Sequence, residues 1–251
     1  MNFPEALAHG DIKEVFKDVF MVTGTMRNEF FGSIWQFSRN MVIVREEGRL
    51  TLINSVRLND AGLAKLDELG TVANIVRIGD MHGLDDRFYL DRYASRNGST
   101  DSVNFWALPD MGVDENSTSA PPVNKLLSID GEMPLSNCSL FVFETTKRPE
   151  AILRLDRDGG IMIACDALQN WVEPDEFFDA ATIEKMREIG FFTPAGVGPA
   201  WIQGNEPQPG DFERLSKMSF KHVLCGHGEP LLETAQADFK NTFQRLFGIA
   251  S

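Results

Sequence analysis

Three stretches of the chain share one pattern, in which a short and largely apolar run ends abruptly in a histidine or an acid. The runs and the residues that follow them are Ile161–Cys165 with Asp166, His222–Cys225 with His227, and Ile75–Ile78 with His82. Short apolar runs beside glycine-containing turns are typical of buried strands. The pattern therefore predicts three strands that deliver histidine or aspartate side chains at their C-terminal ends.

The rest of the hydrophobic pattern alternates between strand-like and helix-like segments. Apolar or alternating runs predict strands at 19–24, 33–44, 49–56, 72–78, 103–108, 125–129, 138–145, 151–155, 160–165 and 221–225. Helical spacing predicts helices at 60–69, 85–94, 175–188, 211–217 and 231–247. Asn59 or Asp60 suits the N-cap of the first helix and Gly70 its end. In the second helix, Leu84 and Phe88 are expected to face inward.

The other segments are expected to be less regular, and the order of elements suggests a fold. Residues 1–18 are expected to be helical or irregular, and residues 109–124 and 190–210 to form loops. Each half of the chain carries strands followed by helices, which predicts two sheets packed face to face with helices outside. No internal repeat or linker divides the sequence, so one domain is expected over residues 1–251.

Composition limits the classes of partner. The 251 residues carry a formal net charge of −13, which argues against nucleic acid and against anionic membrane surfaces. The N-terminal residues lack the pattern of a secretory signal, and no apolar run approaches the roughly 20 residues of a membrane helix. The three cysteines, Cys138, Cys165 and Cys225, suggest reduced buried thiols. We expect a cytoplasmic protein that takes a small-molecule substrate or ligand, with its oligomeric state left open.

Two of the motifs resemble those of the metallo-β-lactamase superfamily. Residues 159–168, which contain Asp166, are similar to the strand of that family that ends in a metal-bridging aspartate. Residues 226–230 are similar to its Gly-His-Gly-x-Pro turn, which supplies a ligand histidine. The resemblance covers most of the chain. It implies the α+β metallo-β-lactamase fold, a four-layer αβ/βα sandwich of two mixed sheets, with Asp166 and His227 as metal ligands.

The main motif of that family, His-x-His-x-Asp-His, is degenerate in this chain. The motif can be aligned with this sequence in two ways. In the first, residues 80–85 match it and only its second histidine is present, as His82. In the second, His82 matches the first histidine, and Leu84, Asp86 and Arg87 stand at the positions of the later ligands. The family's middle histidine is missing between residues 137 and 151, where Glu150 is the nearest acid. The chain has only four histidines, too few for the usual binuclear zinc site. Some divergent branches of the superfamily share such a reduced motif and have no demonstrated hydrolase activity.

The remaining candidates still form a chemically plausible set. His82, Asp85 and Asp86 stand at positions i, i+3 and i+4, which are neighbours on a helical turn. With Asp166 and His227 they suit one transition metal: zinc, iron or manganese. His82, Asp166 and His227 are the predicted metal ligands. Asp85 or Asp86 is the predicted catalytic group, which would orient or deprotonate a water molecule. The alternative is that both acids only complement the dipole at a helix start.

Two functional hypotheses follow. In the first, the protein is a metal-dependent hydrolase of a small organic substrate. In the second, it binds no metal, catalyses nothing and serves as a scaffold for a ligand or partner, with an Asp166–His227 hydrogen bond as a structural relic. Two weaker alternatives are a Cys225–His227 nucleophilic pair and a lid over a hydrophobic substrate that Trp171, Trp201, Phe191 and Phe192 would line.

Overall fold

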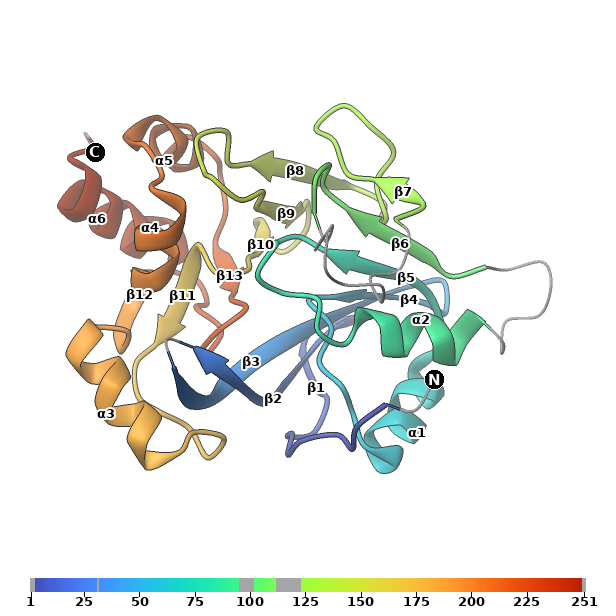
Figure 1. Ribbon diagram of the computed structural model, residues 1–251. Coiled ribbons are helices and arrows are strands. Elements are labelled where there is room, and N and C mark those ends of the chain that lie inside the picture. Colours follow the sequence, from blue (N-terminus) through green and yellow to red (C-terminus); the bar gives the residue numbers. More distant parts are fainter. Residues whose placement is uncertain (1–2, 31, 95–101, 112–122, 250–251) are drawn as a thin grey trace.

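The computed structural model describes residues 3–30, 32–94, 102–111 and 123–249 of the chain (Figure 1). Two sheets pack against each other, and helices cover both outer faces (Figure 1). Most of the loop predicted at 109–124 lies outside the described residues. Among the described helices, none is long and apolar enough to span a membrane.

The first sheet has seven strands in the described part of the chain, and their spatial order follows the sequence. The pairs from β1 to β4 are antiparallel and those from β4 to β7 are parallel, with helices α1 and α2 in the first two parallel connections. The elements of this half are β1 (Lys13–Phe16), β2 (Val19–Phe30), β3 (Ser33–Glu46), β4 (Arg49–Ile53), α1 (Asp60–Leu69), β5 (Thr71–Arg77), α2 (Asp86–Ala94), β6 (Asn104–Ala107) and β7 (Lys125–Leu126).

The second sheet has four described strands in the order β13-β10-β9-β8. β10 pairs parallel with β13 and antiparallel with β9, so this sheet is also mixed. A smaller two-stranded sheet pairs β11 with β12. The elements of this half are β8 (Cys138–Val142), β9 (Ala151–Leu155), β10 (Ile161–Ile163), β11 (Leu168–Trp171), α3 (Ala180–Ile189), β12 (Thr193–Val197), α4 (Pro199–Asn205), α5 (Pro209–Ser216), β13 (His222–Leu224) and α6 (Ala235–Phe247).

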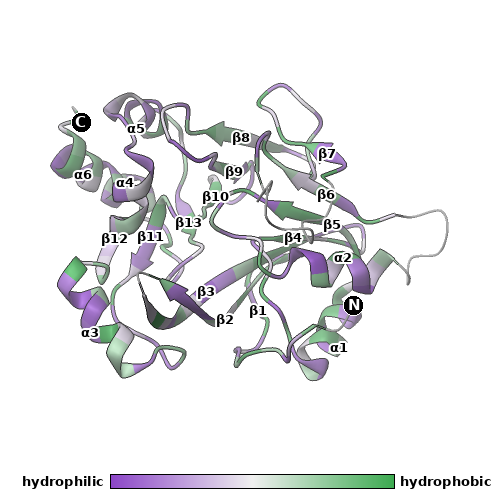
Figure 2. Cartoon of the chain, viewed as in Figure 1, coloured by the Kyte–Doolittle hydropathy of each residue, from purple (hydrophilic) through white to green (hydrophobic). Residues whose placement is uncertain are grey.

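Three apolar layers hold the sandwich together. Val42 of β3 and Ile163 of β10 lie between the two sheets. Their sequence neighbours point the other way, since side chains alternate along a strand: Ile43 packs with α1 and α2, and Met162 packs with α4, α5 and α6. Figure 2 shows hydrophobic residues along the central strands, between helices that carry residues of both kinds. The predicted α+β class and four-layer αβ/βα sandwich are confirmed.

The strand arrangement brings three strand ends to one edge of the sandwich. Because β10 and β13 are parallel and in register, the residues that follow them leave the second sheet on the same side. The end of β5 in the first sheet is tied to the same edge, since the Ala151 N–H donates to the Ile78 carbonyl at 2.7 Å. The two sheets are therefore joined at the position where the sequence predicts functional side chains.

Several local predictions are confirmed and several are wrong. Asn59 is the N-cap of α1, and its side chain accepts from the Gly62 N–H at 3.0 Å.

The segment 190–210 is not one long loop, because it contains β12, α4 and the start of α5. Residues 1–18 contain the strand β1, and β11 was not predicted at all. Leu84 does not face inward: 61% of it is exposed. α4 begins with Pro199, whose fixed φ suits the first turn of a helix.

Candidate metal centre

Three side chains from distant segments meet at the edge where β5, β10 and β13 end. His82 lies between β5 and α2, Asp166 follows β10, and His227 follows β13. The two Nε2 atoms are 3.1 Å apart. The carboxylate of Asp166 has one oxygen 3.1 Å from His227 Nε2 and the other 3.4 Å from His82 Nε2. Each of the three residues is at least nine-tenths buried. The structure thus brings together all three predicted metal ligands.

The turn that carries His227 is held by close backbone contacts. Gly228 has a φ of +83°, and a Cβ there would lie 2.2 Å from the Asn170 carbonyl oxygen. Asn40 of β3 fixes the other side of the turn: its backbone N–H donates to the Gly226 carbonyl at 2.8 Å, and its side-chain amide donates to the Gly228 carbonyl at 2.7 Å. The glycines therefore allow this close packing, and the first sheet positions a ligand that the second sheet supplies.

Hydrogen bonding sets the protonation of the His227 ring. Its Nδ1 lies 2.9 Å from the Ser38 carbonyl oxygen, which can only accept, so Nδ1 carries the proton. The other ring nitrogen, Nε2, lies 3.1 Å from both His82 Nε2 and Asp166 Oδ1 and is the atom that could bind an ion. His82 has no such outer partner, since its Nδ1 is buried without a hydrogen bond to any described residue. Burial lowers the pKa of His82, although the nearby Asp166 carboxylate acts in the opposite direction. The lowered pKa favours the neutral ring.

Asp166 supplies negative charge to the centre. Its burial opposes ionisation, but the interactions with His82 and His227 outweigh that effect and hold the pKa of the carboxyl far below its usual range. An ionised carboxylate between imidazole nitrogens is an electrostatic environment that favours a bound cation.

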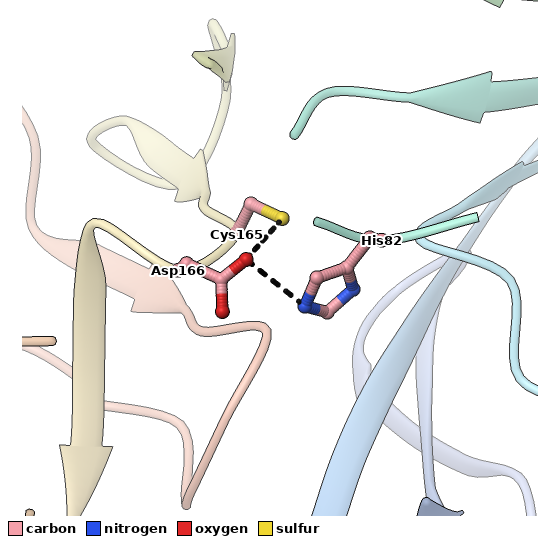
Figure 3. Close-up of side chains that lie close together, drawn as sticks. All are labelled: His82, Cys165 and Asp166. Atoms are coloured by element: carbon pink, nitrogen blue, oxygen red, sulfur yellow. Dashed lines mark hydrogen bonds and ion pairs between the residues drawn. The ribbon is translucent and has the colours of Figure 1, made fainter. Parts of the chain in front are cut away.

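Cys165 adds a sulfur atom to the candidate centre (Figure 3). The sequence predicted it only as a reduced buried thiol. Its Sγ lies 3.5 Å from Asp166 Oδ2, and ligand atoms of Cys165, Asp166 and His82 all lie within 4.8 Å of one another. Gly79 makes room for it, because a Cβ on Gly79 would lie 2.3 Å from the sulfur. Burial raises the pKa of the thiol. The available sequence signal was its position beside Asp166 and on the same side of the strand as Ile161 and Ile163, whose side chains lie between the sheets.

Glu150 is a further buried carboxylate that the sequence analysis noted only as the nearest acid to a missing histidine. It is 2% exposed and precedes β9. One oxygen accepts from the Ala167 N–H at 2.6 Å and the other from the Trp201 indole N–H at 2.7 Å. Burial and the charge of Asp166 raise its pKa. Glu150 therefore anchors the backbone immediately after Asp166 and ties it to α4.

The predicted catalytic acids are held in ion pairs beside the centre. Asp85 pairs with Arg39 and accepts from the Arg57 backbone N–H at 2.9 Å. Asp86, which is fully buried at the start of α2, pairs with Arg77 at 2.8 Å. Neither carboxylate has a described contact with His82, Asp166 or His227. These contacts fit a role in fixing the loop that carries His82, and a catalytic role for either acid stays a prediction.

The two weaker sequence alternatives receive little support. Cys225 packs in the apolar layer beneath α4, α5 and α6, where burial raises the pKa of its thiol. Trp201 and Trp171 are each 2% exposed, so they belong to the core and not to a lid. The Trp171 ring does lie 4.7 Å from the His227 ring, centre to centre, and closes one side of the centre.

The donor set fits one transition-metal ion. Bonds of about 2.0–2.2 Å to nitrogen and oxygen place neighbouring ligand atoms about 2.8–3.1 Å apart in octahedral and about 3.3–3.6 Å apart in tetrahedral coordination. The spacings among His82, Asp166 and His227 are 3.1, 3.1 and 3.4 Å. The Ser38 carbonyl also orients His227 as outer partners orient histidines in metal sites. Two imidazoles, a carboxylate and a nearby thiol match zinc or iron more closely than magnesium or calcium.

Comparisons with known proteins identify the fold. No protein-family profile matches the chain, and no curated protein matches its sequence. Solved structures do match. The metallo-β-lactamase DIM-1, exposed to ceftazidime, is 13% identical with a TM-score of 0.60 over 98% of this chain and 99% of its own. FIM-1 from Pseudomonas aeruginosa, in its mono-zinc form, is 13% identical with a TM-score of 0.58 over 96% and 97%.

A further similar structure is a metallo-β-lactamase from Erythrobacter litoralis, 13% identical with a TM-score of 0.55 over 96% of each chain. Similarity across nearly the whole length, at such low identity, shows the fold. The chain has the metallo-β-lactamase fold, as its sequence motifs implied.

Proposed function

We propose that the protein is a metal-dependent hydrolase of a small organic substrate. The observation that carries this proposal is the convergence of His82, Asp166 and His227, with spacings of 3.1 to 3.4 Å, at a buried edge of the sandwich. The fold supports it, because solved structures of this fold include metallo-β-lactamases, one of them in a mono-zinc form. The ion is zinc, iron or manganese.

Each residue has a separate task in this proposal. The Nε2 atoms of His82 and His227 hold the ion, and Asp166 supplies the negative charge. Cys165 adds a sulfur atom within 4.8 Å of the ligand atoms of His82 and Asp166. When bound, the ion polarises a carbonyl or phosphoryl oxygen of the substrate and makes a water molecule more acidic. The burial of the ligands excludes bulk water, which strengthens these electrostatic interactions.

The role of Asp85 and Asp86 follows from their ion pairs. Asp85 is paired with Arg39 and Asp86 with Arg77, and both arginines are buried. We propose that their main contribution is to hold the loop 79–86, and that any proton transfer is made by Asp85, the more exposed of the two. Asp85→Asn should then lower kcat with little effect on metal content, whereas Asp86→Asn should mainly lower stability.

The test is a metal count on protein purified without chelator. About one transition-metal ion per chain is expected, and His227→Ala should lose it. His222→Ala is the matched control, because His222 is equally buried but binds the Asp158 carbonyl and the Glu233 N–H, away from the centre. Zinc at 100 times its Kd should stabilise the wild type by about 2.7 kcal/mol. No ion in the wild type, and no thermal shift with zinc, iron or manganese, would overturn the proposal.

One observation favours a second candidate, the metal-free binding scaffold. Hydrogen bonds can join the three side chains without an ion if the Nε2–H groups of His82 and His227 each donate to one oxygen of Asp166. This candidate predicts that added metal changes the melting temperature of neither the wild type nor His227→Ala. A metal-dependent rise in the wild type that His227→Ala abolishes would exclude it.

A further inference from the structure

A cavity of about 630 Å³ lies beside the metal centre, outside the residues that would hold the ion. Four segments form its walls: the N-terminal segment before β1, the β2–β3 hairpin, the loop between β4 and α1, and the loop between β5 and α2. The volume is within the range of about 300–1,000 Å³ that small-molecule sites occupy. Its chemistry therefore indicates what kind of molecule it would accept.

One wall of the cavity is apolar and exposed. Leu7, Ile34 and Leu84 line it, and 46%, 45% and 61% of their surfaces are accessible to solvent. Each comes from a different segment, so the exposed apolar surface results from the way the walls come together. Covering it with an apolar ligand would remove this surface from water, which is favourable.

Arg57 supplies an uncommitted positive charge to the same cavity. Its guanidinium lies 4.5 Å from the centre of the Phe88 ring and 5.6 Å from that of Phe3, so two aromatic contacts hold it in place. No carboxylate in the described ranges forms an ion pair with it. A half-buried guanidinium without an anionic partner is a ready donor for a carboxylate or another oxyanion.

The other charges of the cavity do not compete for this role. The charge of Arg39 is taken by Asp85, so that pair is close to neutral. Arg27, Glu5 and Glu29 also line the cavity, but all three are exposed to solvent, where water screens their charge. The cavity therefore has a positive interior at Arg57 and a mixed, hydrated rim.

The walls are fixed before any ligand binds. The N-terminal segment is attached to β2 through Thr25, whose backbone N–H and hydroxyl donate to the Ala8 carbonyl at 2.9 and 2.7 Å. The Gly10 N–H adds a bond to the Thr23 carbonyl at 2.8 Å. A preformed cavity binds its ligand with a smaller ordering cost than a flexible one.

We propose that this cavity binds a small amphipathic carboxylate, with the carboxylate on Arg57 and the apolar body against Leu7, Ile34 and Leu84. The binding itself does not depend on a metal ion. The further step, that this ligand is also the substrate, rests on the proposed function. The cavity and the candidate metal centre do share one boundary. Leu84 and Asp85 line the cavity and follow His82 in the same loop, and Arg39 lines it and follows Ser38, whose carbonyl orients His227.

The test uses two probes of equal chain length and opposite charge, decanoate and decylamine, titrated by calorimetry and by ligand-detected NMR. Decanoate should bind saturably and more tightly than decylamine. Arg57→Gln should weaken decanoate binding about fivefold or more, because a charge-assisted bond is lost. Leu84→Asn should weaken both probes. Arg187→Gln is the matched control, since Arg187 also lies over a ring, that of Phe192 at 5.9 Å, but is not part of the cavity.

Each outcome decides the proposal. It is overturned if decanoate does not bind, if Arg57→Gln binds it as tightly as the wild type, or if decylamine binds at least as well. The same titration on His227→Ala separates the two proposals. Retained decanoate binding in a variant without metal supports the cavity on its own, and a wild type that binds decanoate but holds no ion would refute only the hydrolase.

Discussion

The contact between Gly79 and Cys165 leads to a prediction about how the centre is packed. Replacing Gly79 with alanine adds a Cβ 2.3 Å from the Cys165 sulfur and 3.0 Å from its Cβ. Favourable contacts between such atoms begin at about 3.5 Å, so the sulfur would have to move by more than an ångström. Cys165 is fully buried between the sheets, and because protein interiors are close-packed its sulfur can move only by displacing neighbours.

The expected size of the effect follows from that overlap. Gly79→Ala should destabilise the protein by about 1–3 kcal/mol, the range for overpacking a filled core. Cys165→Ala removes the sulfur and should cost about 1–2 kcal/mol through lost burial. In the double variant the new methyl group occupies part of the vacated space, with only the 3.0 Å contact left to relax. The two changes should therefore be coupled by about 1–2 kcal/mol in favour of the pair.

The assay is urea unfolding followed by circular dichroism, with chelator in every sample so that metal binding does not contribute. Gly204→Ala is the control, since no atom lies within 4 Å of its added Cβ and it stands inside α4. That change should be neutral or stabilising by about 0.5–1 kcal/mol. A Gly79→Ala variant as stable as the wild type, or one that loses the same stability with and without the Cys165 sulfur, would contradict this prediction.

Two further predictions concern the scaffold. The side chain of Asp211 is 1% exposed and accepts four hydrogen bonds of 2.5–3.0 Å. Asp211→Asn should therefore lower the free energy of unfolding at pH 7 by about 2–4 kcal/mol. The control, Asp156→Asn, changes a side chain that is 71% exposed and should lower it by less than about 0.5 kcal/mol. Burial opposes ionisation of Asp211, but those hydrogen bonds lower its pKa in the folded protein. The stabilising effect of the ionised Asp211 is therefore complete above the pKa of the unfolded state, about 3.9, and is lost as the pH falls through the lower pKa of the folded state. The difference in stability between the wild type and Asp211→Asn should thus shrink in acid, and a constant difference would contradict this. Gly228→Ala should cost about 3 kcal/mol or more, because φ is +83° and the added Cβ meets backbone at 2.2 Å, whereas Gly210→Ala meets nothing within 4 Å and should melt like the wild type.

The strand ends were predictable because a buried strand that stops at a polar residue leaves a strong local pattern. Asp166 and His227 follow apolar runs with glycines nearby, and His82 follows another such run, so their approach to one edge could be inferred. The segment 190–210 could not be inferred in the same way. Its Gly and Pro content suggests a loop, yet β12 is stabilised by pairing with β11, and such a contact between distant residues leaves no local signal.

The outer parts of the centre were less predictable for a related reason. Glu150 carries no motif, and its role depends on donors at Ala167 and Trp201 that only the folded chain brings near. The arginine partners of Asp85 and Asp86 lie on β3 and β5, so the spacing of the two acids in the sequence gave no sign of their ion pairs.

The origin of the three candidate ligands has a mechanical consequence. His82 belongs to the N-terminal half of the chain, whereas Asp166 and His227 belong to the C-terminal half. An ion bound by all three would act as a crosslink between two separately built layers, and its removal would let them part more easily at that edge. Resistance to proteolysis along this seam would then report on metal occupancy, even before any substrate is known.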